Sequence, residues 1–123
     1  MDISREIARM KEEPGFRENV GMILVHNGVV RGWSRVDHSP VAQIRVEPNQ
    51  EKIDALREEY SKRPGIYKIL IEARSGLLSP GDDLLFIMVA GDIRENVKPV
   101  LSELLDRVKS EAVSKKEFID TRI

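Results

Sequence analysis

The amino-acid sequence predicts an α+β fold in which helices pack on a mostly antiparallel sheet. Its 123 residues, 41% of them hydrophobic and 33% charged, suffice for one domain with its own core, over residues 1–123. Segments with helical or strand periodicity follow one another in the order helix, strand, strand, helix, strand, strand, helix. Successive strands without an intervening helix favour antiparallel pairing. Proline–glycine pairs at 14–15, 64–65 and 80–81 separate the segments.

The chain begins with a predicted helix followed by a strand. Ile3, Ile7 and Met10 recur at the spacing of one helix face. The apolar segment 20–26 is typical of a strand. Residues 28–32 continue or bend that strand, because their glycines permit a bulge or a close backbone approach.

A polar segment, residues 33–40, predicts a loop before the next strand at 41–46. The helix after that strand starts near Pro48–Asn49. Its apolar stripe consists of Ile53, Leu56 and Tyr60.

Two further strands and a long helix complete the predicted fold. Residues 66–74 and 83–89 are expected to be neighbouring strands joined by a short connection, with a type II turn at Ser79–Asp82. The helix after them starts at Asp92, whose spacing to a following glutamate suits a capping box, or near Asn96, which would put the helix proline in the first turn. The two starts are not distinguished by the sequence.

Several classes of function lack their signatures. Cysteine is absent, the two histidines are isolated from other metal-ligating residues, and no phosphate-binding glycine loop occurs. We therefore expect no metal and no cofactor. The net charge of −1 gives no reason to expect nucleic acid. Neither a membrane span nor a secretory signal is present, so we expect a cytoplasmic protein.

Lysines and arginines are the remaining chemical groups. Lys109 and Lys116 are seven residues apart and would share one side of the last helix if it continued. A partly desolvated lysine beside other cations can lose its proton and act as a base or nucleophile. Arg31 and Arg94 follow predicted strands and could hold phosphate. An ordinary solvated helix face is the competing interpretation of the lysine pair.

Four segments, in order along the chain, resemble a known family. They are Gly28–Arg31, Ala73–Asp82, Gly91–Arg94, and Val108–Lys109 taken with Val113–Glu117. These resemble the G-x-V-R, H-R-x-G-x-L-x-x-G-D, S-A-H-R and L-K…P-x-W-K-K-E motifs of the MoaE family, the large subunit of molybdopterin synthase. The resemblance implies an α/β hammerhead fold and a homodimer.

The resemblance also implies an activity and a partner. The family's enzyme converts cyclic pyranopterin monophosphate to molybdopterin in molybdenum cofactor biosynthesis by installing two sulfurs. The sulfur comes from the C-terminal thiocarboxylate of a small ubiquitin-like subunit, which enters a pocket of the large subunit. Two small subunits and the homodimer form a heterotetramer.

The family's site residues can be transferred to this sequence by position. Lys109 would lie near the thiocarboxylate tail, and Lys116 would contact the pterin or assist proton transfer. Lys115 is the alternative to Lys116 if the local alignment shifts by one residue. Arg31 and Arg94 would bind the substrate phosphate or the small subunit's C-terminus.

The end of the chain and two replaced histidines complete the comparison with the family. Arg122 resembles a terminal family arginine that reaches the neighbouring subunit's pocket. Ile93 and Ala73 stand where the family has active-site histidines. The retained cations predict an enzyme. The replacements motivate two alternatives: a non-catalytic member that binds a ubiquitin-like partner or a phosphorylated ligand, and a dimeric scaffold.

Overall fold

The structure is a computed structural model that describes residues 1–121. Its elements, in chain order, are α1 Ile3–Lys11, α2 Phe16–Asn19, β1 Met22–Val29, β2 Val41–Pro48, α3 Gln50–Ser61, β3 Ile66–Ala73, β4 Gly76–Leu78, β5 Asp83–Gly91, α4 Arg94–Arg107, the π-helix η1 Val108–Ala112 and β6 Val113–Ile119. The predicted α+β class is confirmed. Within the described residues, no helix is long and apolar enough to cross a membrane.

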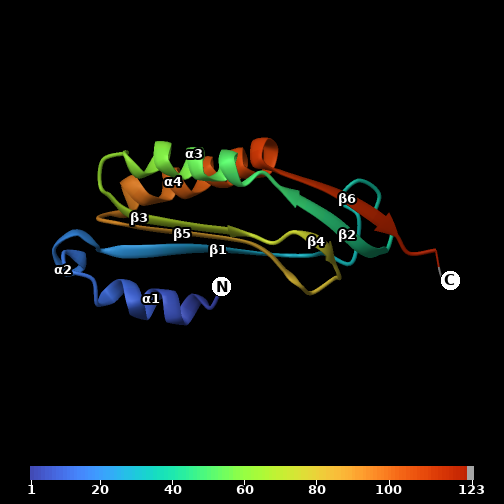
Figure 1. The fold of residues 1–123 in the computed structure, drawn as a ribbon, viewed down its shortest axis with the longest axis horizontal. Coiled ribbons are helices and arrows are strands. Elements are labelled where there is room, and N and C mark those ends of the chain that lie inside the picture. The colour runs from blue at the N-terminus through green and yellow to red at the C-terminus, as the bar shows by residue number, and fades with distance from the viewer. Residues whose placement is uncertain (122–123) are drawn as a thin grey trace.

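The strands form two three-stranded antiparallel sheets. The first has the order β1-β5-β3 and the second the order β4-β2-β6. Helices α3 and α4 cover one face of the first sheet and α1 covers the other, while the second sheet extends the molecule at one end (Figure 1). The junction between the two sheets therefore lies close to where α4 ends.

The central strand β5 is buried on both faces. Ile87 and Val89 pack in the large core beneath α3 and α4, and Met88 and Ala90 pack in the smaller core against α1. Because side chains alternate across a strand, a strand covered on both sides is apolar at nearly every position. This explains the continuous hydrophobic run of this segment.

Helices α1 and α3 begin where the sequence supplies side-chain caps. The Asp2 carboxylate accepts a bond from the Arg5 N–H at 3.0 Å, and the Asn49 side chain accepts one from the Lys52 N–H at 3.1 Å. Asn49 thus caps α3, as expected from its position. The predicted stripe of α3 is buried, with Tyr60 only 2% exposed.

The connection between β3 and β5 differs from the predicted short link. The turn itself is as expected: the Asp82 N–H donates to the Ser79 carbonyl at 3.0 Å, and Gly81 has φ +94°. The residues before it, however, leave the first sheet. Gly76–Leu78 forms β4 and pairs with Ile44–Val46 of the second sheet, because Leu78 completes the core there with 3% exposure.

Helix α4 starts between the two predicted positions. Ile93 is its N-cap, and Asp92 accepts bonds from the Ile93 N–H and from the side-chain amide of Asn96. Pro99 therefore lies in the second turn rather than the first. Its missing N–H leaves the Glu95 carbonyl without the usual helical donor.

Residues Val113–Ile119 form strand β6, so the condition under which Lys109 and Lys116 would share a helix face, a continued last helix, is not met. One π-helical turn follows α4, and Val113–Ile119 then pairs with β2 along its length. Lys109 and Lys116 consequently do not share a helix face. The sequence 114–117 carries polar side chains on both faces, which conceals the strand alternation.

Leu104 and Leu77 provide a matched test of this core. Leu104 is 0% exposed and Leu77 is 49% exposed. We expect Leu104→Ala to lower the free energy of unfolding by about 2–5 kcal/mol, because it leaves a cavity between α4 and the first sheet. Leu77→Ala should change it by less than about 1 kcal/mol. Urea denaturation of both variants measures the difference, and equal losses would contradict this packing.

Candidate functional site

A cavity of about 300 Å³ lies at the junction of the two sheets. It is lined by cations and a histidine from β1, the 31–40 loop, η1 and β6, namely His26, Arg31, Arg35, Lys109 and Lys115. An adjoining cavity of about 180 Å³ shares Arg35, Lys109 and Lys115 with it. Among residues 1–121, no carboxylate lines either cavity. The recess is therefore suited to an anionic ligand.

Apolar residues form the wall opposite the cations. Leu84 and Leu85, at the start of β5, line both cavities. They are 8% and 3% exposed, so most of each side chain belongs to the core. A buried wall lowers the local dielectric response and strengthens the interaction between the cations and a bound anion.

Arg31 is positioned by the end of β1. A register shift between Gly28 and Val29 bends the strand. Val30 then exchanges two backbone hydrogen bonds with the 79–82 turn, from its N–H to the Asp82 carbonyl and from the Gly81 N–H to its own carbonyl, both 2.9 Å. These bonds hold the backbone just before Arg31, whose guanidinium lies 4.9 Å from the centre of the Trp33 ring.

The π-helical turn η1 brings Lys109 to the cavity. Val108 and Ala112 are buried in the core at 0% and 1% exposure, which fixes the orientation of the turn. Lys109 lies between them on the side that faces the recess. The wider turn ends α4 and directs the chain into β6. Strand β6 then brings a second lysine to the cavity.

The pairing of β6 with β2 decides which lysine that is. Lys115 is opposite Val46, a core residue with 1% exposure, and Lys116 is opposite the exposed Arg45. Directly paired residues project from the same face of a sheet. Lys115 therefore projects from the same face of the second sheet as Val46, and it lines the cavity with Lys109 while staying largely exposed to solvent. Lys116 faces outward, with its ammonium 5.5 Å from the centre of the Phe118 ring.

The cavity cations remain free of ion pairs within residues 1–121. The salt bridges in this part of the chain use other cations, such as Arg63, Lys68 and Arg107. Arg31, Arg35, Lys109 and Lys115 take part in none.

The environment lowers the pKa of Lys115. Partial burial of the ammonium is the main cause, followed by repulsion from Arg31 and from Lys109, while Glu117 acts in the opposite direction. A larger fraction of Lys115 is therefore the neutral amine than in a free lysine.

His26 is a second group with a lowered pKa. Burial is the larger cause and the charge of Lys109 the smaller. Its Nε2 atom is buried and has no hydrogen-bond partner among the described residues. Because folding disfavours the protonated form, His26 destabilises the folded state as pH falls below the ordinary histidine value of 6.5.

The remaining predicted residues lie elsewhere. Lys116 lines a different recess of about 310 Å³ with Arg45 and Glu47, and Lys115 borders that recess as well as the cavity. Arg94 is the first residue of α4, is exposed, and contacts Glu95 at 3.4 Å. The 14 residues of α4 separate it from Lys109 by about 20 Å. Arg122 lies outside the described residues.

Two residues of the cavity were not predicted. Arg35 lies in a polar loop with no periodicity, so only the folded loop reveals its position. His26 is a strand residue in the predicted segment 20–26, and its alternation with Met22 and Leu24, which pack against the large core, could have indicated that it faces α4.

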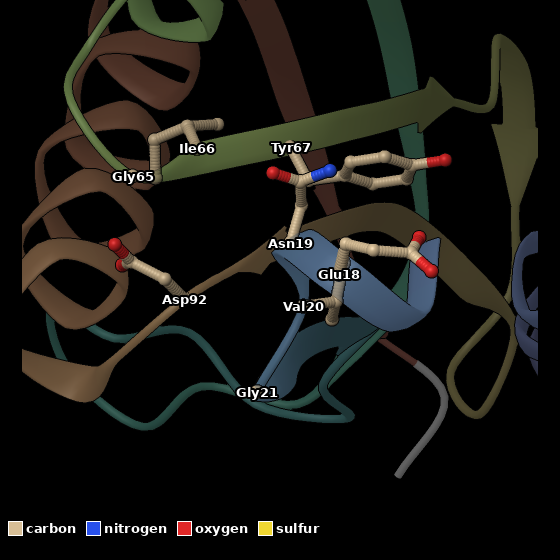
Figure 2. Close-up of a pocket in the computed structure, with 8 residues that line it drawn as sticks. All are labelled: Glu18, Asn19, Val20, Gly21, Gly65, Ile66, Tyr67 and Asp92. Atoms are coloured by element: carbon tan, nitrogen blue, oxygen red, sulfur yellow. The ribbon is translucent and has the colours of Figure 1, made fainter. Parts of the chain in front are cut away.

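A larger cavity of about 530 Å³ lies between α2, the start of β3 and the residues before α4. Figure 2 shows Glu18 and Asn19 on one side of it and Asp92 on the other. Its polar groups are largely engaged, since the amide of Asn19 donates to Gly15 and the hydroxyl of Tyr67 donates to Glu13. Within residues 1–121 no cluster of histidine and acidic side chains could hold a metal ion.

The sequence and fold identify the class of protein. The MoaE protein family matches residues 1–111, and the chain therefore belongs to that family. A probable molybdopterin synthase of Haloferax volcanii is 28% identical over 116 residues. That match spans 90% of this chain but only 44% of the Haloferax protein.

Solved structures share the fold. A molybdopterin synthase from Staphylococcus aureus has a TM-score of 0.75 at 22% identity, covering 95% of this chain and 85% of its own. A molybdopterin cofactor biosynthesis protein E from Burkholderia multivorans gives 0.74 at 22% identity, covering 98% and 82%. A complex of subunits 1 and 2 of the molybdopterin-converting factor from Helicobacter pylori gives 0.69 at 16% identity, covering 99% and 82%.

The titration of Lys115 tests the geometry of the cavity. We expect its pKa, measured by NMR of the lysine side chain, to lie below the ordinary value of 10.5. Arg31→Met should raise it, because a neighbouring positive charge is removed. Arg5→Met, on α1, is the matched control and should leave it unchanged. An unshifted Lys115 would mean that the cations are not gathered as described.

Proposed function

We propose that this chain is the large subunit of a molybdopterin synthase. It would transfer sulfur from the C-terminal thiocarboxylate of a small ubiquitin-like subunit to cyclic pyranopterin monophosphate, in the cytoplasm. Membership of the MoaE family supports the reaction class. The observation that carries the proposal is the cavity, whose cations have neither an ion pair nor a neighbouring carboxylate within the described residues. Both the thiocarboxylate tail and the cyclic phosphate are anions.

Lys109 and Lys115 would serve the chemistry. Lys109 would hold the negative charge of the tail, as the family resemblance implies. Lys115 would exchange protons with the substrate, because its lowered pKa increases the fraction of neutral amine. Lys115 is preferred to Lys116 for this role because Lys115 lines the cavity together with Lys109. The seven-residue spacing from Lys109 had indicated Lys116 instead. Arg31 would bind the substrate phosphate or the tail.

A homodimer would complete the site. Arg94 is too far along α4 to reach the cavity of its own chain, yet it is exposed and its neighbour Ile93 is 53% exposed. In a dimer, Arg94 of one subunit, together with Arg122, would supply the cavity of the other. With one small subunit on each large subunit the assembly is a heterotetramer. The two-subunit composition of the Helicobacter pylori complex supports such a partner.

A non-catalytic role is the second candidate. Ile93 stands at the N-cap of α4, where it donates and accepts no side-chain hydrogen bond. A family member without that histidine could bind the small subunit or a phosphorylated ligand and make no product.

The lysines separate these possibilities. Purified protein is mixed with the thiocarboxylated small subunit and the cyclic pterin, and molybdopterin is followed by the fluorescence of its oxidised product. Lys109→Ala and Lys115→Ala should each slow product formation by about 10²–10⁴-fold, and Lys116→Ala should have little effect. Lys62→Ala, at the end of α3, is the control. Turnover that survives Lys109→Ala refutes the assignment of Lys109, and small-subunit binding by the unaltered protein without product favours the non-catalytic role.

Mixed dimers test the contribution of the second subunit. Lys109→Ala and Arg94→Ala are prepared separately, unfolded together and refolded. If Arg94 serves the partner's cavity, hybrid dimers contain one intact site and activity returns to about a quarter of the unaltered value. If Arg94 serves its own cavity, each hybrid site retains one defect and no activity returns. Refolded single variants provide the baseline.

A further inference from the structure

We propose that Arg35 is an oxyanion-binding residue of the cationic cavity, held there by the stacked rings of Trp33 and His38. This rests on the proposed function, because it names a further substrate-binding residue of the same site. The oxyanion is either the phosphate of the pterin or the carboxylate end of the small subunit. A guanidinium binds both in the same bidentate manner.

The loop that carries Arg35 is closed by its own hydrogen bonds. Trp33 and Pro40 form a β-bridge, and the Ser34 N–H donates to the Ser39 carbonyl at 2.8 Å. The His38 N–H in turn donates to the Ser34 carbonyl at 2.8 Å, and Ser34 is 5% exposed. Arg35 thus lies on a short turn whose base is fixed.

Ring stacking fixes the sides of this turn. The Trp33 and His38 rings lie 4.6 Å apart and are inclined by only 9°, and Arg31 approaches the Trp33 ring to 4.9 Å. His38 has φ +62°, a conformation that a non-glycine residue keeps only when its surroundings hold it. The stack therefore connects Arg31 to the loop on which Arg35 lies.

The charge of Arg35 is directed into the site and is not neutralised by its own loop. Arg35 lines both cavities with Lys109 and Lys115. The nearest acid in sequence, Asp37, accepts a bond from the Ser39 N–H at 3.0 Å. Within residues 1–121 Arg35 forms no salt bridge. The N–H donors of Arg35 are therefore available to bind an anion. They would supply hydrogen bonds that Ile93, which stands where the family has a histidine, cannot donate.

The single tryptophan of the chain is Trp33, so its fluorescence reports directly on this loop. The full chain is titrated with inorganic phosphate and, separately, with a peptide that ends in Gly-Gly, both at constant ionic strength. We expect Arg35→Ala to weaken binding of at least one of them about tenfold or more, and Arg35→Lys to weaken it less. Arg5→Ala, on α1, is the matched control. Loss with phosphate alone identifies the pterin phosphate, and loss with the peptide alone identifies the tail.

His38→Ala tests the positioning role of the stack. Measured by calorimetry, it should weaken the same anion in the unaltered background and have no further effect in Arg35→Ala, since it acts through Arg35. Equal effects in both backgrounds would overturn the positioning role. Phosphate and peptide binding that Arg35→Ala leaves unchanged, or no binding to the unaltered protein, would overturn the proposal.

Failure of this proposal and failure of the proposed function give different results. If anions bind in a manner that depends on Arg35 but no molybdopterin forms, the proposed synthase function is refuted and the anion-binding role of Arg35 is supported. If Arg35→Ala forms molybdopterin with unchanged KM values for the pterin and for the small subunit, the role of Arg35 is refuted and the synthase function stands.

Discussion

Burial of β5 on both faces is the constraint on which the rest of the structure depends. A strand with no solvated side needs cover above and below, which α4 and α1 provide. Close backbone packing at Gly91, the last residue of β5, fixes where helix α4 starts. A Cβ atom added to Gly91 would lie 2.5 Å from the Gly65 carbonyl and 2.6 Å from Val97, so only glycine allows α4 to approach so closely. The course of α4 then determines where Lys109 arrives.

The functional cavity arises where regular packing ends. Helix α4 gives way to a π-turn, and β1 bends at Gly28. Both irregularities occur at the junction of the two sheets, where the large core stops at Leu84 and Leu85. A packed core has no room for four cations. The junction leaves a recess that is apolar on one side and open on the other, and the lysines and arginines of neighbouring elements turn into it.

Local patterns predicted those elements whose side chains mainly fill the core. Examples are the apolar stripe of Ile53, Leu56 and Tyr60 and the hydrophobic run in β5. The spacing of these residues predicts the element, because burial requires apolar residues at fixed intervals. Strand β6 was missed because the positions that alternate with Val113 are polar: Lys115, which lines the cavity, and Glu117. Apolar residues at these positions would have shown the alternation that predicts a strand. Similarly, Arg35 could not be predicted, because its place depends on the closure of its loop.

The charge of the cavity is maintained by the ion pairs around it. The chain has as many acidic as basic residues, within one, so acids were available to neutralise the cluster. Glu111 is only two residues from Lys109, yet it bonds to Arg107 at 2.7 Å and contacts Lys52 at 3.2 Å. These cations lower the pKa of Glu111 to about 2. Because Glu111 is engaged by these two cations, it does not neutralise the four cavity cations, and within residues 1–121 their mutual repulsion favours the binding of an anion.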